Sequence, residues 1–209
     1  KWDLHVHTPA SFHWMGGKRL YEMTADEKEA AFQQMLDTIN QSDVAVFGVM
    51  DYWTFDGYLE FKKYVKEKGL ELKKTVLPGI ELRIESPTNY RLNIHVILSD
   101  KLSEQNLQDF KHCLKLRYTK RPLSDEALKE IPKHIGNDRI RVLGFDPNNM
   151  SEDDLYMCGA KAAEITRESL EQAIATIPKD TAFIILPFDT SDGLSRLNWK
   201  DHPLAATDF

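Results

Sequence analysis

A short histidine motif near the N-terminus has the residue types and the spacing of a metal site. In Asp3-Leu4-His5-Val6-His7, the alternation of a strand would put both imidazoles on one face, while Leu4 and Val6 point into a core. Two imidazoles side by side on one strand face can hold one metal ion. The motif alone also fits a pair of hydrogen-bonded structural histidines, so its chemistry depends on the residues that join it.

Four further side chains with ligating atoms occur downstream. His13, Asp51, Glu81 and His95 each follow or end an apolar run that is typical of a buried strand. Barrel-type α/β enzymes carry their ligands at such strand ends. We therefore predict that these side chains converge with the two histidines of the motif on one site.

Glu81 and Asp51 could each have a role other than metal binding. A carboxylate at Glu81, inside an apolar run, would be costly to bury without a cation, and a partner arginine, Arg83 or Arg91, is the alternative to a metal. Asp51 could instead be a turn residue at the end of a strand. In a metal site, Asp3 and Asp51 could accept hydrogen bonds from histidine N–H groups and orient the imidazoles.

Composition limits the class of protein. A chain of 209 residues with 42% hydrophobic content can bury one core, so we expect a single domain over residues 1–209. Only Cys113 and Cys158 occur, outside any C-x-x-C arrangement, which disfavours a disulfide framework or a thiolate zinc site. Any metal must then use nitrogen and oxygen ligands. The net charge of −6 argues against a surface that binds nucleic acid over its whole extent.

Segments that target or anchor a protein are not evident in the sequence. No stretch is apolar enough to cross a bilayer, and the first residues lack the pattern of an export signal, so we expect a soluble cytoplasmic protein. The chain starts at Lys1 without an initiator methionine and stops at Phe209 without a capping signal. We expect it to be a fragment of a longer protein, whose further domains could supply more ligands.

Strands and helices alternate along the predicted chain. Thr24 is the predicted N-cap of a helix, with Glu27 in capping-box spacing. Apolar strands between helices indicate a parallel sheet, and ligands at strand ends suggest a closed or nearly closed barrel. Strands are predicted at 2–6, 44–49, 75–77, 80–84 and 92–98, with a possible one at 140–145 and a buried one at 182–186; helices are predicted at 24–42, 55–68, 103–116, 125–131 and 166–177.

Four segments together carry a resemblance to a known family. The runs at residues 3–11, 49–51, 78–81 and 93–98 resemble the successive motifs of the PHP (polymerase and histidinol phosphatase) superfamily. The resemblance implies a distorted (β/α)7 TIM-like barrel with two or three metal ions at its C-terminal rim, and the hydrolysis of phosphoesters. His5 and His7 would bind the first metal, Glu81 would bridge the first and second, His95 would bind the second, and His13 would serve a third.

Some positions depart from the family pattern. The second motif usually contains Asp-His, whereas here Tyr52 follows the aspartate. An expected His-Pro pair appears here as Leu186-Pro187-Phe188-Asp189, in which Asp189 could act as a substitute oxygen ligand. Asp201 and His202 are nearest to a terminal Asp-x-His, but adjacent residues of a strand point to opposite faces. The sequence thus supports the first and second metals better than the third.

The predicted function is that of a metal-dependent phosphoesterase. Two ions can bridge a hydroxide nucleophile and clamp the phosphoryl oxygens, and mixed nitrogen and oxygen ligation suits Zn, Mn or Fe better than Mg or Ca. The primary ligands would be His5, His7, Glu81 and His95, the secondary ligands would be His13, Asp51 and Asp189, and the catalytic residues would be Glu81, Asp51 and His13.

The predicted substrate is a nucleic acid or a nucleotide. The N-terminal motif, with Trp14 after His13, is further similar to the PHP domain of TrlF-like ATPases of the AAA or SMC type, and this similarity implies a nuclease linked to DNA repair or defence, followed by an ATPase domain. The alternative is a catalytically degenerate barrel that binds metal or nucleic acid and regulates the ATPase, for which Tyr52 and Pro187 argue. Amide or deaminase-type hydrolysis is a third possibility, which the Pro-Gly-Ile-Glu motif at 78–81 disfavours.

Two groups of side chains could contact such a substrate. Aromatic residues near the end of a predicted ligand-bearing strand could stack on a nucleobase, although core packing is their commoner use; they are Tyr52, Trp53, Phe55 and Tyr58. A basic run could contact phosphates, although charge runs usually face water; it comprises Lys111, Lys115, Arg117, Lys120 and Arg121.

Overall fold

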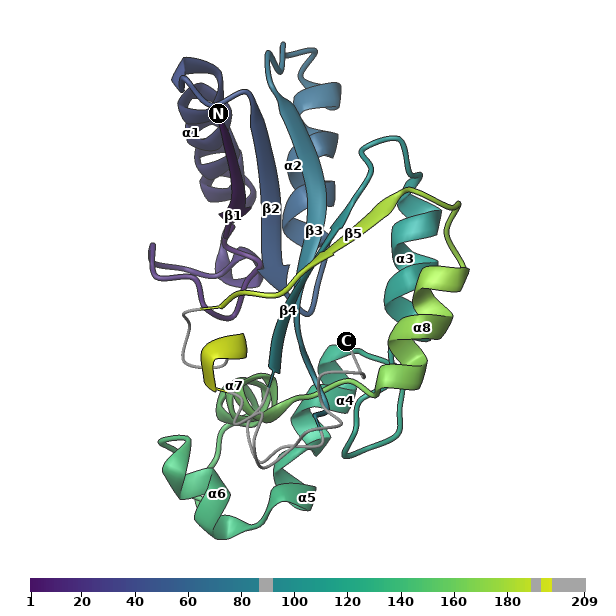
Figure 1. Ribbon diagram of the computed structural model, residues 1–209. Coiled ribbons are helices and arrows are strands. Elements are labelled where there is room, and N and C mark those ends of the chain that lie inside the picture. Colours follow the sequence, from purple (N-terminus) through teal and green to yellow (C-terminus); the bar gives the residue numbers. More distant parts are fainter. Residues whose placement is uncertain (87–91, 189–192, 197–209) are drawn as a thin grey trace. The chain divides into compact units, whose positions relative to one another are not determined.

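The computed structural model describes residues 1–86, 92–188 and 193–196 (Figure 1). The chain divides into two compact units. The first comprises Lys1–Glu81, Val96–Leu107 and Asp180–Phe183, and the second comprises Leu82–His95, Gln108–Lys179 and Ile184–Phe209. A single domain over the whole chain therefore stays a prediction.

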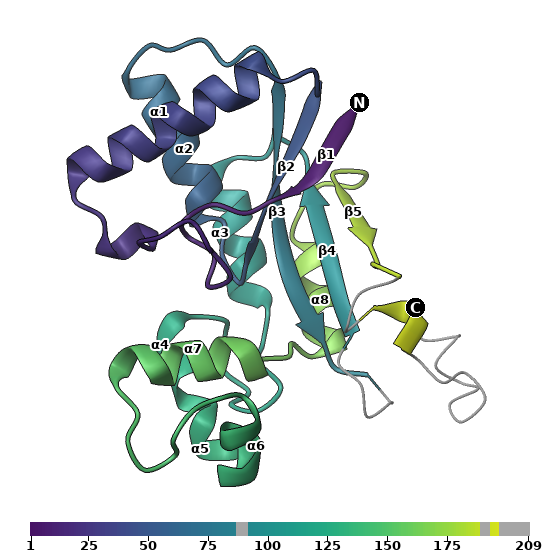
Figure 2. The ribbon, with the colours of Figure 1, turned by 90° about the vertical axis from the view of Figure 1, so that its left-hand side faces the viewer.

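One five-stranded sheet is formed in the order β1-β2-β3-β4-β5. Its strands are β1 (Trp2–Val6), β2 (Val46–Tyr52), β3 (Thr75–Ile84), β4 (Leu92–Leu98) and β5 (Ala182–Ile185). β1, β2 and β3 are parallel, whereas Figure 2 shows β4 running opposite to β3. The sheet is thus mixed, and the prediction of a parallel sheet holds for its first three strands.

The edges of the sheet bear on the predicted barrel. Among the described residues, β1 and β5 each have one neighbouring strand, so this part of the chain forms an open sheet. The α/β class is confirmed, and closure into a seven-stranded barrel stays a prediction. β5 was predicted to be buried, and this is wrong, because Phe183, Ile184 and Ile185 are exposed.

Two helices of the first unit follow the predicted pattern. α1 (Ala25–Gln41) begins at the predicted N-cap Thr24, and both bonds of the capping box with Glu27 are present. α2 (Asp56–Glu67) ends just before Gly69, whose φ of +62° suits glycine. Figure 2 shows both helices on the same face of the parallel strands. Their buried side chains include Phe32, Leu36, Ile39, Tyr58, Phe61 and Val65.

β3 runs through the Pro-Gly pair that was predicted to interrupt it. Pro78 and Gly79 pair in register with Val49 and Met50 of β2. A Cβ at Gly79 would lie 2.6 Å from Cε of Met50 and 2.8 Å from the carbonyl oxygen of Val49. The glycine therefore permits close approach of the two strands rather than a turn.

The second unit is mainly helical. Its helices include the C-terminal part of α3 (Glu104–Cys113), α4 (Asp125–Glu130), α5 (Pro132–Ile135), α6 (Asn137–Val142), α7 (Glu152–Ala162) and α8 (Arg167–Ala175). Short 3-10 turns lie at Leu20–Glu22 in the first unit and at Leu194–Arg196 in the second. The possible strand over 140–145 is wrong, because this segment contains the end of α6.

The long helix α7 was missed by the sequence analysis. Ser151 and Asp154 form a complete capping box at its start, which is a signal that the sequence carries. α7 packs against α4 at very short range, because a Cβ at Gly159 would lie 1.9 Å from the carbonyl oxygen of Leu128. Gly159 therefore lets the two backbones approach closely.

Candidate metal centre

The two histidines of the N-terminal motif lie at the carboxyl end of β1. The pairing of β1 with β2 shifts register between Asp3 and Val6, so β1 carries an irregularity beside His5. Gly48 of β2 faces this part of β1, and a Cβ there would lie 2.9 Å from the carbonyl oxygen of Leu4. A glycine in β2 thus lets the irregular strand approach closely, just before the histidines.

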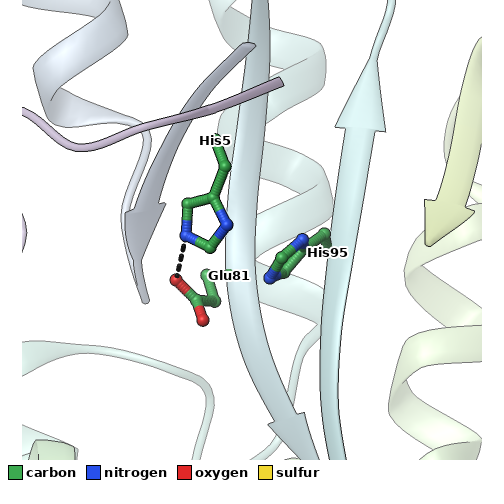
Figure 3. A group of neighbouring side chains, drawn as sticks. All are labelled: His5, Glu81 and His95. Carbon is green, nitrogen blue, oxygen red and sulfur yellow. Dashed lines mark hydrogen bonds and ion pairs between the residues drawn. The ribbon is translucent and has the colours of Figure 1, made fainter. Parts of the chain in front are cut away.

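His5 and His7 meet Glu81 of β3 in a small triangle of ligand atoms. The Nε2 atoms of the two histidines are 3.2 Å apart. Nε2 of His5 lies 3.2 Å and Nε2 of His7 lies 3.4 Å from the same oxygen, Oε2 of Glu81. The predicted convergence of these three side chains is therefore observed, and Figure 3 shows the contact of His5 with Glu81.

The size of this triangle fits a transition metal ion. In tetrahedral coordination with ligand distances of about 2.0 to 2.1 Å, two adjacent ligand atoms lie about 3.3 Å apart. The three observed distances, 3.2, 3.2 and 3.4 Å, bracket this value. One imidazole pair and one carboxylate form a mixed donor set of the kind that Zn, Mn or Fe accepts. The arrangement leaves a fourth position for a water or a substrate oxygen.

His95 was predicted as a further ligand, and it lies on β4, the neighbour of β3 in the sheet. Its side chain is buried. In the group of His5, Glu81 and His95, one ligand atom of each residue lies within 4.8 Å of the others (Figure 3). The structure thus brings His95 near two of the residues of the triangle, His5 and Glu81.

Glu81 is held by the end of β2. Its residue pairs with Tyr52 in the parallel register, and its carbonyl oxygen accepts a hydrogen bond of 3.2 Å from the backbone N–H of Trp53. Trp53 is buried and has a φ of +66°, an uncommon conformation for a bulky residue. The turn at Trp53 therefore fixes the position of Glu81 relative to the end of β2, beside the histidines.

Glu81 is in direct contact with His5. Glu81 is 2% exposed. The hydrogen bond between Glu81 and His5 is the largest of the effects that raise the pKa of His5 above its ordinary value. Partial burial of the imidazole opposes this rise. Arg83, one of the arginines considered as an alternative partner, donates to the carbonyl oxygen of Ala160 at 3.3 Å. Arg91, the other, lies outside the described residues.

Asp51 lies behind His7 rather than in the triangle. Its Oδ1 is 4.0 Å from Nδ1 of His7, which is longer than a hydrogen bond. Its two oxygens accept hydrogen bonds from the backbone N–H and the hydroxyl of Thr8, at 2.7 and 2.6 Å. Burial raises the pKa of Asp51 to about 7, and the Thr8 hydrogen bonds oppose this rise. Asp51 thus anchors the residue next to His7.

The start of α2 closes over this aspartate. A Cβ at Gly57 would lie 1.9 Å from Oγ1 of Thr8 and 2.2 Å from Oδ2 of Asp51. Only glycine therefore fits in the first turn of α2 at this place. Thr8 and Gly57 were missed by the sequence analysis, although a glycine in the first turn of a predicted helix is a signal for close approach.

His13 and Tyr52 pack against each other beside the triangle. The imidazole of His13 is exposed, and its centroid lies 4.9 Å from the ring of Tyr52. Tyr52 is buried and is stacked on His7, with centroids 5.8 Å apart and ring planes 12° apart. The structure therefore brings His13 next to the site through an aromatic contact.

The remaining candidates divide into four groups. Asp3 accepts a hydrogen bond from the backbone N–H of His5, not from an imidazole. Trp53, Phe55 and Tyr58 are buried, as core residues are. Of the basic run, Arg117 pairs with Glu164 and Arg121 with Glu130. Three predicted positions lie outside the described residues, namely Asp189, Asp201 and His202.

Comparison with known proteins gives little guidance. No family model and no curated protein matches this chain. One solved structure that matches is a candidate metal-dependent phosphoesterase from Bifidobacterium adolescentis, with 12% identity and a TM-score of 0.43 over 99% of this chain and 74% of that chain. Another is an amidohydrolase from Chromobacterium violaceum with bound sulfate and no metal, with 14% identity and a TM-score of 0.35 over 83% and 49%.

Both TM-scores are below 0.5, so no property of this chain is inferred from these two proteins. Within the described residues, no helix combines the length and the apolar character that a membrane span needs.

Proposed function

We propose that this chain is a metal-dependent hydrolase that acts on phosphoesters. The observation that supports it is the triangle of His5, His7 and Glu81, whose three ligand atoms are spaced as the corners of one face of a metal coordination tetrahedron. Glu81 is buried, and the charge of a carboxylate is costly to bury without a cation.

Each residue has a role in this proposal. His5 and His7 would hold the first ion, Glu81 would be shared between the first and a second ion, and His95 would hold the second. Asp51 positions His7 through Thr8, which it anchors with two hydrogen bonds. His13 is exposed next to the site and serves as a third-site ligand or as a proton donor to the leaving group. Asp189 is the proposed substitute ligand from the C-terminal part.

A bound pair of divalent Zn, Mn or Fe ions would activate a water and neutralise charge on the phosphoryl oxygens. The protein groups supply the rest of the catalytic arrangement. Imidazoles and carboxylate fix the position of the cations, and the stack of Tyr52 on His7 limits motion of one ligand ring. A metal held by these three protein ligands would have a further coordination position that a substrate oxygen could occupy.

The choice of a phosphoester, and of the PHP barrel around the site, rests on the sequence resemblance. That resemblance also motivates a nucleic-acid or nucleotide substrate, a following ATPase domain and a cytoplasmic location. A degenerate regulatory module is the second candidate, and the burial of Tyr52 at a position expected to hold an imidazole favours it. Metal content and turnover together distinguish the two.

Elemental analysis and a hydrolysis assay test the proposal. The wild-type chain should carry close to two ions and should hydrolyse an activated phosphodiester, and a chelator should abolish this activity. His7→Ala and Glu81→Gln should each lower the activity by at least about 100-fold, since both remove a ligand. Glu29→Gln, an exposed residue of α1 that pairs with Lys68, is the matched control.

Two results would contradict the proposal. Activity that survives both ligand substitutions and the chelator would exclude metal catalysis at this site. A protein that binds two ions and has no activity on phosphodiesters, phosphomonoesters or single-stranded DNA would favour the regulatory module. A comparison of these three substrates also tests the expected preference for nucleic acid.

A further inference from the structure

Tyr52 occupies the centre of a cluster of rings around the proposed metal ligands. Its ring lies 5.8 Å from that of His7, 4.9 Å from that of His13 and 4.8 Å from that of Phe12, measured between centroids. The side chain is 4% exposed. All four residues belong to the first unit, where β1 and β2 end side by side.

The contact with His7 differs in kind from the other two. The planes of Tyr52 and His7 are 12° apart, so the rings are stacked in parallel, whereas His13 and Phe12 are tilted by 57° and 55°. Stacked and tilted arrangements are both favourable for ring pairs, and the stacked one aligns the plane of the imidazole with that of the tyrosine. Tyr52 therefore acts on the orientation of one specific ligand ring.

Orientation matters because an imidazole binds a metal only along the lone pair of its nitrogen. The χ2 torsion of histidine is broad, so the ring plane is poorly defined by the side chain itself. Metal-bound histidines usually gain a fixed plane from a hydrogen bond at the other nitrogen. In His7, Nδ1 lies 4.0 Å from Oδ1 of Asp51, too far for that hydrogen bond.

We propose that Tyr52 is a positioning residue for the metal centre, and that its stacked ring keeps Nε2 of His7 directed at the ion shared with His5 and Glu81. This inference rests on the proposed function. It assigns the role to the aromatic plane and not to the phenol oxygen.

Metal affinity of the full chain tests this role. Zn²⁺ binding is measured by competition with a chromogenic chelator, and the geometry of the site is followed by the visible absorption of bound Co²⁺. Tyr52→Met fills a similar volume without a ring plane, and Tyr52→Phe keeps the plane without the hydroxyl. Tyr58→Met is the matched control, since Tyr58 is a buried tyrosine of α2.

The expected result is a specific pattern among the variants. Tyr52→Met should bind Zn²⁺ about 10-fold more weakly and should shift the Co²⁺ absorption, as losses of groups that orient a ligand do. Tyr52→Phe should restore both properties to the wild-type values. Tyr58→Met should lower stability and leave affinity and absorption unchanged. Tyr52→Leu replaces Tyr52→Met if the latter does not fold.

Several results would overturn the role of Tyr52. Wild-type affinity in Tyr52→Met would mean that the ring only fills space. A defect in Tyr52→Phe equal to that in Tyr52→Met would assign the role to the phenol oxygen instead. If the wild-type chain itself binds neither Zn²⁺ nor Co²⁺, the proposed function fails as a whole, which separates that failure from one confined to Tyr52.

Discussion

Replacement of Asp51 by asparagine should stabilise the metal-free protein, and the gain should grow as the pH rises. The carboxyl group of Asp51 is buried, and burial raises its pKa from 3.8 to about 7. Asparagine keeps the shape of the side chain. Its oxygen can accept from the backbone N–H of Thr8, and its amide can donate to the Thr8 hydroxyl.

The sign of the effect follows from proton linkage. A carboxyl group with a raised pKa holds its proton longer in the folded state than in the unfolded state, so the free energy of unfolding falls as the pH rises from about 4 to about 7. Each pKa unit corresponds to about 1.4 kcal/mol, and ionisation of Asp51 therefore removes about 2.5 kcal/mol between about pH 5 and about pH 8. Asp51→Asn lacks this loss.

Urea unfolding in the presence of a chelator, at about pH 5 and at about pH 8, measures the difference in the free energy of unfolding between Asp51→Asn and the wild type. The free energy of unfolding of Asp51→Asn, relative to the wild type, should rise by about 2.5 kcal/mol from the acidic to the alkaline condition. Asp37→Asn, which removes an exposed carboxylate of α1, controls for the loss of one charge. A relative stability of Asp51→Asn that is constant with pH would refute the reasoning that Asp51 is buried at a raised pKa.

Two glycine substitutions test the close contacts of the structure. Gly57→Ala should destabilise the protein by about 2 kcal/mol or more in urea unfolding, since its Cβ would overlap Thr8 and Asp51, and it should also weaken Zn²⁺ binding. Gly159→Ala should destabilise by a similar amount, because its Cβ would meet backbone of Leu128, but it should leave Zn²⁺ binding unchanged. If both substitutions weakened Zn²⁺ binding equally, the inference that only the Gly57 contact lies at the metal site would be contradicted.

The sequence was sufficient where local rules decide the structure. The capping box of Thr24 and Glu27 predicted the start of α1, and the apolar runs predicted where β2, β3 and β4 lie. The convergence of His5, His7 and Glu81 also followed from the pattern, because neighbouring parallel strands bring their carboxyl ends to one edge of the sheet. These three side chains meet as expected.

The direction of β4 could have been predicted and was not. Seven residues, 85–91, separate the end of β3 from the start of β4. A parallel connection needs a crossover of a dozen or more residues, so this short link favours an antiparallel neighbour. The apolar character of β4 indicated its burial, but that character does not distinguish the two directions.

Other features depend on contacts that the sequence does not display. The segment 140–145 contains β-branched and apolar residues, yet Val142 is 85% exposed and only Ile140 of α6 is buried. The hydrogen bonds between Thr8 and Asp51 depend on the close packing of the first turn of α2, at Gly57, against these two side chains. Exposure of β5 likewise depends on what covers it, which no local pattern encodes.

The distance along the chain between His5 and Glu81 has a consequence for how the protein folds. The two ligands are separated by 76 positions, and to hold them together in an unfolded chain costs about 4 kcal/mol of loop-closure entropy. An ion therefore gains its full set of ligands only after β1, β2 and β3 have paired. Bound metal should consequently slow unfolding and leave the refolding rate almost unchanged. Its main effect should then be to lengthen the lifetime of the folded state.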